Sequence, residues 1–332
     1  MPWWESKLFK VISYILFGPN NGIYILDENW DSLIILDACR YDIFKNIAKE
    51  LDLPGHLEYR ISRGTDTRTF LIENFVKYNS PKLKEVVYVS ANPFVDLLIR
   101  DRVFKVIPVW RYAWNDELNT VHPVHVYYYA LLVAKKYSNK RIIVHFLQPH
   151  FPYTESFSSI NTRLSKYIEN LRQRGISNRL ELPEENEIKL QNRIKRILKM
   201  IIKRSIYTFE PFAEINVNEH IKAYSENLKI VLLYAKRLAI LLKGTTVITS
   251  DHGEAFGERL HQFIPFRVYG HVPGIRIESI MKVPWHVITD DEKDRIMPNR
   301  AEVFEEEYRR AIVNVFARRV KQSISTIIRK KR

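Results

Sequence analysis

Three apolar segments of this sequence each run directly into residues that can carry chemistry. The segments are Ser32–Leu36, Arg141–Leu147 and Thr246–Ile248, and the residues that follow them are Asp37, His150 and the adjacent pair Asp251 and His252. Near-continuous apolar runs are typical of strands that are covered on both faces, as in parallel sheets. The carboxyl ends of such strands lie at one edge of the sheet, where ligands bind. The pattern therefore predicts an α/β fold that gathers these side chains at one edge.

Helical patterns separate the apolar segments. Asp42–Glu50 and Thr67–Asn79 have apolar residues at helical spacing, and two further strands are expected at Val86–Val89 and Lys105–Val109. Strands that alternate with helices indicate a largely parallel sheet.

The predicted domain organisation has one catalytic domain with additions. We expect an amphipathic N-terminal segment over residues 1–30, a catalytic domain over 31–290 and a basic C-terminal helix over 291–332. The charged stretch at about 154–216 lacks a clear strand, so it is interpreted as an inserted helical cap.

Composition restricts the partners and the location. Among 332 residues, 52 Lys and Arg against 38 Asp and Glu give a net charge of +14, which favours partners that carry phosphate or sulfate. The single cysteine, Cys39, excludes an internal disulfide. No run of 18 apolar residues occurs, and residues 2–17 lack a signal-peptide cleavage site, so we expect a protein that is cytoplasmic or peripheral to a membrane. Residues 2–17 suit either a packed first helix or a helix on a membrane surface.

Carboxylates beside imidazoles suggest a metal site. Asp37, Asp251 and His252 suit Mn²⁺ or Zn²⁺, whereas an all-oxygen set favours Mg²⁺ or Ca²⁺. The alternative for Thr249–Glu254 is an ordinary polar turn after a strand, because Asp and Gly are common turn residues.

A second segment, Ser62–Thr69, offers a glycine followed by three threonines where a helix is expected to begin. Backbone N–H groups at a helix start favour an anion, and a hydroxyl that is held beside a metal can become a nucleophile. The alternative is a plain helix cap, a position that threonine also favours.

These elements occur in a particular order along the chain. They are Asp37 after a strand, a Gly-Thr helix start at Thr65, a His-Phe-Pro element at His150, the motif Thr249–Glu254, and Gly270-His271. This order resembles the alkaline phosphatase superfamily. It is most similar to the sulfatase-like branch, which includes phosphoglycerol transferases, lipoteichoic acid synthases and archaeal sulfatase-like proteins. The resemblance covers about residues 32–285 and implies a three-layer αβα sandwich.

The resemblance also implies a role for each site residue. The metal ligands would be Asp37, Thr65, Asp251 and His252, the catalytic residues Thr65, His150 and His271, and the substrate-binding residues Arg40, Arg68 and Thr67. Thr65 is preferred to Thr67 as nucleophile because the order from Thr65 to Phe70 resembles the Thr-Ser-Asp-Ser-Glu-Phe of the synthases. His150 and His271 would hold the transferred group, protonate the leaving group or bind a second metal. The two arginines would clamp an oxyanion in bidentate fashion.

Two departures from the family pattern shape the expected chemistry. No C/S-x-P-x-R motif, the site of formylglycine in true sulfatases, surrounds Thr65. Where two-metal members carry Asp-x-x-x-His, this chain has His150 and Thr154. We therefore expect one essential divalent ion, Mn²⁺ or Zn²⁺ ahead of Mg²⁺ or Ca²⁺, and leave a second ion open.

The leading hypothesis is a metal-dependent phosphoesterase or phosphotransferase with a threonine nucleophile. Its substrate would be an anionic ester that is linked to a lipid or a polysaccharide, with membrane contact through the termini and no role for nucleic acid. One alternative is a sulfuric ester hydrolase with an unusual nucleophile. Another is a catalytically silent module that binds a membrane or a nucleic acid.

Overall fold

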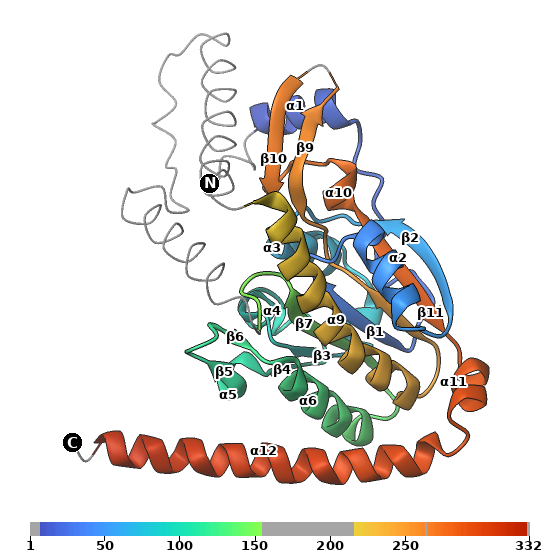
Figure 1. Cartoon of the computed structure of the whole chain (residues 1–332), viewed down its shortest axis with the longest axis vertical. Coiled ribbons are helices and arrows are strands. Elements are labelled where there is room, and N and C mark those ends of the chain that lie inside the picture. The colour runs from blue at the N-terminus through green and yellow to red at the C-terminus, as the bar shows by residue number, and fades with distance from the viewer. Residues whose placement is uncertain (1–6, 155–215, 263, 331–332) are drawn as a thin grey trace.

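The computed structural model describes residues 7–154, 216–262 and 264–330 (Figure 1). The helical cap that the sequence predicts at about 154–216 lies, apart from its two ends, outside the described residues. The division into an N-terminal segment, a catalytic domain and a C-terminal helix stays a prediction.

A seven-stranded sheet forms the centre of the described structure. Its strands are, in spatial order, β2 (His56–Ile61), β11 (Lys282–Ile288), β8 (Thr246–Thr249), β1 (Ser32–Asp37), β7 (Arg141–Pro149), β3 (Val86–Ser90) and β4 (Lys105–Pro108). Only β11 runs against the other strands of this sheet, because it pairs antiparallel with both β8 and β2. The predicted largely parallel sheet is therefore confirmed, and the sequence patterns missed β2 and β11, which are neighbouring strands at one side of the sheet.

Each central strand sends alternate side chains to opposite faces of the sheet. In β1, Ile34 and Leu36 belong to one buried cluster, and Leu33 and Ile35 belong to the other. All four side chains are fully buried. Because a strand alternates with a period of two, burial on both faces requires a continuous apolar run. Each such side chain contributes about 1.5–3 kcal/mol to the free energy of unfolding.

Helices cover both faces. The face of Ile34 and Leu36 packs against α2 (Tyr41–Glu50), α6 (Pro123–Lys136) and α9 (Val217–Leu241), with α12 (Arg300–Lys330) outside α6 and α9 (Figure 1). The face of Leu33 and Ile35 packs against α3 (Thr67–Leu71), the π-helical segment η2 (Ile72–Lys77), the 3₁₀ helix η3 (Pro81–Glu85) and α4 (Pro93–Ile99). The described structure is thus a three-layer αβα sandwich.

Smaller elements lie around this sandwich. They are α1 (Lys7–Phe17), α5 (Trp110–Ala113), the hairpin β5 (Trp114–Asn115) and β6 (Thr120–Val121), the hairpin β9 (Ala255–His261) and β10 (Ile264–Gly270), α10 (Glu278–Met281) and α11 (Asp290–Ile296). Helix α1 packs against the β9–β10 hairpin through Ile12 and Phe17 (Figure 1). No helix among the described residues is both long and apolar enough to cross a bilayer.

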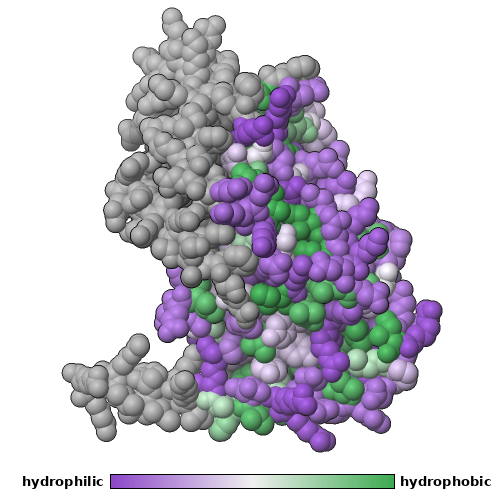
Figure 2. Space-filling view, viewed as in Figure 1, coloured by the Kyte–Doolittle hydropathy of each residue, from purple (hydrophilic) through white to green (hydrophobic). Residues whose placement is uncertain are grey.

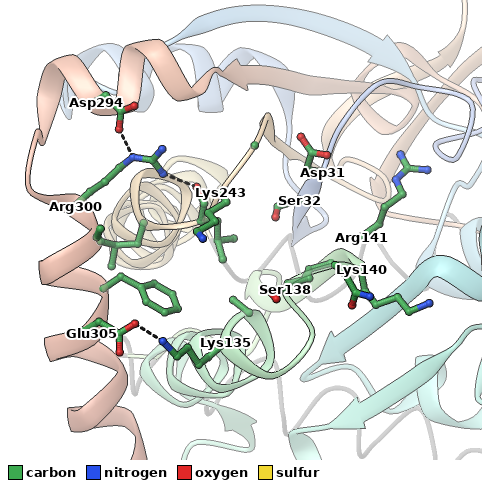
Figure 3. A pocket seen from close by; sticks show the side chains of 18 of the residues that line it. Asp31, Ser32, Lys135, Ser138, Lys140, Arg141, Lys243, Asp294, Arg300 and Glu305 are labelled. Carbon is green, nitrogen blue, oxygen red and sulfur yellow. Dashed lines mark hydrogen bonds and ion pairs between the residues drawn. The ribbon is translucent and has the colours of Figure 1, made fainter.

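A cavity of about 730 Å³ lies at the edge of the sheet where β1 and β7 begin (Figure 3). Two ion pairs lie along its wall, one between Lys135 and Glu305 and one between Arg300 and Asp294. The Arg141 guanidinium instead donates to backbone carbonyls of the segment before β1. The charged side chains named here thus join helices and strands to one another.

The face shown in Figure 2 is mainly hydrophilic where residues are described, and its apolar residues form scattered patches. Scattered exposed apolar residues are normal for a folded domain and need no partner to explain them.

Lys293 in α11 is a fully buried lysine that holds the end of α9. Its Nζ donates to the carbonyl oxygens of Leu242 and Gly244 and to the hydroxyl of Thr246. The last carbonyls of a helix have no partner within the helix, so the lysine satisfies acceptors that would otherwise be buried unpaired.

We expect Lys293→Met to lower the free energy of unfolding by about 1–3 kcal/mol, because the acceptors lose their donor while the apolar volume is kept. Urea unfolding followed by circular dichroism measures this change. Lys45→Met, at an exposed position in α2, is the matched control. Equal stability of the two variants would contradict the role given to Lys293.

Candidate metal centre

Three neighbouring strands bring four potential ligands together. Asp37 is the last residue of β1, Asp251 and His252 follow β8 by two and three residues, and His145 lies within β7. Because β1 pairs in parallel with β8 on one side and β7 on the other, Ile35 lies between Thr249 and His145. Two residues further on, the chains of β1 and β8 therefore present Asp37 and Asp251 side by side.

The four side chains converge on one small buried space. The Nε2 atom of His252 lies 3.6 Å from Asp37 Oδ1 and 3.5 Å from Asp251 Oδ2. The Nε2 atom of His145 lies 3.8 Å from Oδ2 of each aspartate. All four residues are at most 2% exposed. One atom from each of Asp37, His145 and Asp251 lies within 4.8 Å of the others, a spacing that can hold a metal ion.

The hydrogen bonds of this cluster leave the facing atoms free. His252 Nδ1 contacts the carbonyl oxygen of Gly253 at 2.8 Å, where it must donate, and His145 Nδ1 lies 3.0 Å from the Tyr88 hydroxyl. In contrast, His145 Nε2, His252 Nε2 and Asp251 Oδ2 are buried without a hydrogen-bond partner among the described residues. Unpaired buried polar atoms are costly, and a neighbour that holds one ring nitrogen orients the other toward a metal. The residues present therefore fit a divalent ion.

The charges of the cluster support the same conclusion. Burial and the neighbouring Asp251 raise the pKa of Asp37 well above its ordinary value. Burial would also raise the pKa of Asp251, but His252 and His145 outweigh it and hold that pKa below its ordinary value. Burial lowers the pKa of His145 to about 4, so this imidazole is neutral at pH 7. Two aspartates beside the neutral imidazole of His145 match the ligand preferences of Zn²⁺ and Mn²⁺.

The hydroxyl beside this cluster belongs to Thr67. Its Oγ1 lies 3.5 and 3.4 Å from the two carboxylate oxygens of Asp37. Asn92 Nδ2 donates to Asp37 at 2.8 Å and lies 3.4 Å from Thr67 Oγ1. The Thr65 hydroxyl instead accepts the N–H of Gly274 at 2.8 Å. Asp66 caps α3, so its first residue, Thr67, points its hydroxyl at the end of β1.

His150, Glu254 and His271 form a second cluster of potential ligands. His271 Nδ1 lies 2.9 Å from Glu254 Oε2, and the His271 ring lies 4.9 Å from that of His150 and 4.5 Å from that of His252, centroid to centroid. The second cluster therefore adjoins the first. Thr154, which the sequence resemblance sets at the histidine position of the Asp-x-x-x-His pattern, bonds Asn227 through its hydroxyl at 2.8 Å.

The second cluster is strongly polarised. Burial would raise the pKa of Glu254, yet the neighbouring His271 holds it at about 2. Burial would lower the pKa of His271, yet Glu254 raises it to about 9. Burial and His271 together lower the pKa of His150 to about 4. An ionised Glu254–His271 pair thus faces a neutral imidazole, an arrangement that can hold a second cation or place a proton donor beside the first cluster.

The two arginines singled out from the sequence are differently engaged. Arg40 bonds both carboxylate oxygens of Asp42, at 2.9 and 2.7 Å, and also pairs with Glu258. Arg68, in the first turn of α3, is half-buried, and its side chain has no hydrogen bond or ion pair to another described residue. Arg68 is therefore the freer of the two to bind an anion.

Three residues of this site were missed by the sequence interpretation. His145 lies within an apolar strand, where a lone histidine resembles a core residue. The only sequence feature that could have identified it is the presence of an ionisable residue in that apolar run. Glu254 lies within the motif Thr249–Glu254, but the sequence pattern indicates no role for it. Asn92 caps α4, and its amide gave no sign that it would bond Asp37.

Comparison with known proteins gives distant structural similarities. No family model and no curated protein matches the sequence. The integral membrane lipooligosaccharide phosphoethanolamine transferase A (EptA) from Neisseria meningitidis aligns with 83% of this chain at 12% identity and a TM-score of 0.45, and this chain covers 50% of it. This chain thus spans about half the length of that enzyme.

Two further solved structures are similar at the same level. The C-terminal periplasmic domain of EcEptC from Escherichia coli, in complex with Zn, has 13% identity and a TM-score of 0.44 over 84% of this chain and 78% of its own. An alkaline phosphatase superfamily protein from Vibrio parahaemolyticus has 11% identity and a TM-score of 0.39 over 84% and 72%. Similarity at this level assigns no reaction, so the chemistry must be argued from the side chains of this chain.

The unpaired ring and carboxylate atoms predict stoichiometric binding of Zn²⁺ or Mn²⁺. We expect His145→Ala and Asp251→Asn each to weaken metal binding at least about 10-fold, because each removes one of the converging atoms. Elemental analysis after dialysis measures bound metal, and the ion should raise the melting temperature of the unmodified protein alone.

His56→Ala is the control for these variants, since the His56 side chain is 75% exposed and lies outside the cluster. Tight binding that survives both cluster substitutions would place the metal elsewhere.

Proposed function

We propose that this chain is a metal-dependent phosphoesterase or phosphotransferase of the alkaline phosphatase superfamily, with Thr67 as its nucleophile. One observation carries the proposal: the Thr67 hydroxyl lies 3.4–3.5 Å from the carboxylate of Asp37, beside the unpaired buried atoms of Asp251, His252 and His145. A hydroxyl next to a metal centre is the arrangement that activates a nucleophile for attack on an ester. Thr67 thereby replaces Thr65, which the order of residues favoured.

The metal would be held by Asp37, Asp251, His252 and His145. A bound divalent ion would act as a Lewis acid: it would stabilise the negative charge on the phosphoryl oxygens and lower the pKa of a nearby hydroxyl. Zn²⁺ and Mn²⁺ suit this donor set, and the His150, Glu254 and His271 cluster leaves a second ion open.

In the proposed phosphoryl transfer, separate side chains act as nucleophile, proton acceptor and proton donor. The Thr67 Oγ1–phosphorus bond forms while the bond from phosphorus to the leaving alcohol breaks, and the hydroxyl proton passes to the adjacent Asp37 carboxylate. His271, which is ion-paired with Glu254, donates a proton to the leaving oxygen. In the second step the oxygen of water or of a second alcohol attacks the phosphorus and gives its proton to His271, while the bond from phosphorus to Thr67 Oγ1 breaks and that oxygen recovers its proton from Asp37. The identity of the attacking acceptor therefore decides between hydrolysis and transfer.

The proposed substrate is an anionic phosphate ester, linked to a lipid or a polysaccharide. The net charge of +14 supports an anionic partner. A sulfuric ester hydrolase is the second candidate, and the chemistry of Cys39 gives it no support, because that thiol is fully buried and burial raises its pKa.

Purified protein with Zn²⁺ or Mn²⁺ should hydrolyse aryl phosphate mono- or diesters faster than aryl sulfates. We expect Thr67→Val and Asp251→Asn each to lower kcat at least about 10³-fold, because one removes the nucleophile and the other a ligand. Full activity of Thr67→Val would refute the assignment of the nucleophile. Faster turnover of sulfates would favour the second candidate.

Arg68→Ala should raise KM for the phosphate ester about 10-fold or more, since a charge-assisted hydrogen bond to the anion is lost. Steady-state kinetics measure this, and Arg309→Ala, at an exposed position in α12, is the matched control. An unchanged KM would exclude Arg68 from substrate binding.

A further inference from the structure

We propose that Thr65 is a positioning residue that connects helix α1 and the loop carrying His271 to the helix that begins with Thr67. The inference rests on the proposed function, because it takes Thr67 as the nucleophile. It gives the buried Thr65 hydroxyl, which the mechanism leaves unused, a role of its own.

The Thr65 hydroxyl lies at a junction between two segments that are far apart in the sequence. Thr65 is 4% exposed, and its Oγ1 accepts the N–H of Gly274 at 2.8 Å and lies 3.5 Å from Asp66 Oδ2. The backbone N–H of Thr65 donates to the Thr69 hydroxyl at 2.9 Å. Asp66 and Thr69 also form the capping box of α3. Thr65 is therefore bonded on one side to the cap of the helix that presents Thr67.

On its other side, Thr65 holds the loop that follows His271. Gly274, three residues after His271, has a φ of +81°, a conformation that favours glycine. Its carbonyl oxygen accepts a hydrogen bond from the Ser13 hydroxyl of α1 at 3.1 Å. Gly274 thus joins α1 to Thr65, because its carbonyl oxygen bonds Ser13 and its N–H bonds Thr65.

Helix α1 is held against this loop by hydrogen bonds and by apolar packing. Arg276 donates to the carbonyl oxygen of Ser13, within α1, and to that of Gly18, the residue that follows α1. Ile12 and Phe17 pack into the same apolar cluster as Val272 and the buried residues Ile275 and Ile277. Movement of α1 would therefore move the loop.

The consequence for catalysis is geometric. The Thr67 hydroxyl and the His271 imidazole must face the same phosphoryl group, and a misplacement of about 1 Å can cost about 100-fold in rate. Thr65 joins the segments that carry them, so its hydroxyl fixes their separation while the four proposed metal ligands stay as they are.

The test uses the full chain loaded with Zn²⁺ or Mn²⁺ and an aryl phosphate ester. Thr65→Val keeps the side-chain volume but removes the acceptor of the Gly274 N–H. We expect it to lower kcat about 10- to 100-fold, with KM and bound metal nearly unchanged. Thr65→Ser restores the hydroxyl and should recover kcat to within about 3-fold of the unmodified protein. Thr245→Val, at the far edge of the sheet, is the matched control.

Ser13→Ala is the partner variant. It should lower kcat in the same direction, and the double variant with Thr65→Val should lose less than the sum of the two single effects in free energy, because both act through Gly274. Unchanged kcat in Thr65→Val, or additive effects in the double variant, would overturn the proposal.

Two readouts separate this inference from the proposed function. Amide hydrogen exchange over residues 272–277 should speed up in Thr65→Val and Ser13→Ala, whether or not the protein turns over the ester. Unchanged exchange overturns the positioning role and leaves Thr67 as the nucleophile. Mass spectrometry of trapped phosphoprotein should find phosphate on Thr67. Phosphate on Thr65 would overturn both assignments, and phosphate on neither residue would refute the nucleophile while the exchange result stands.

Discussion

Two carboxylates, Asp37 and Asp251, are buried side by side at the edge of the sheet, and the arrangement around them depends on offsetting their charge. A buried carboxylate is costly unless it is paired, hydrogen-bonded or bound to a metal. Asn92 and Thr67 provide hydrogen-bonding partners for Asp37, and backbone N–H groups provide them for Asp251. The imidazoles of the cluster are held with nitrogen atoms facing inward. A divalent cation is the partner that would neutralise both carboxylates at once.

The two edges of the sheet, where the strands end and where they begin, differ in the side chains that they carry. The carboxyl ends of β1, β7 and β8 converge because they are neighbours in one parallel group, and the helices on the face of Ile35 begin there with Thr67 and Asn92 close to Asp37. At the opposite edge, charged groups such as Lys135 and Glu305 pair with each other (Figure 3). The potential metal ligands therefore lie where the strands end, and the ion pairs that join the helices lie where the strands begin.

The two clusters at the carboxyl edge of the sheet differ in their internal chemistry. The cluster of Asp37 and Asp251 has unpaired atoms facing a common point, whereas Glu254 and His271 already satisfy one another. The cluster of Asp37 and Asp251 can bind a metal ion. The Glu254–His271 ion pair can hold a proton beside that ion. Their ring contact through His252 and His271 makes them one continuous site.

The sequence by itself determined the strand ends, because apolar runs buried on both faces are recognisable without any partner. That was sufficient to place Asp37, Asp251 and His252 at one edge. It could not identify His145, since a histidine inside an apolar strand looks like a core residue until the register sets it beside Ile35 and Tyr88. Nor could it choose between Thr65 and Thr67. Only the tertiary structure decided which hydroxyl lies next to Asp37, because the direction of each side chain depends on where Asp66 caps the helix and on how Gly274 packs against it.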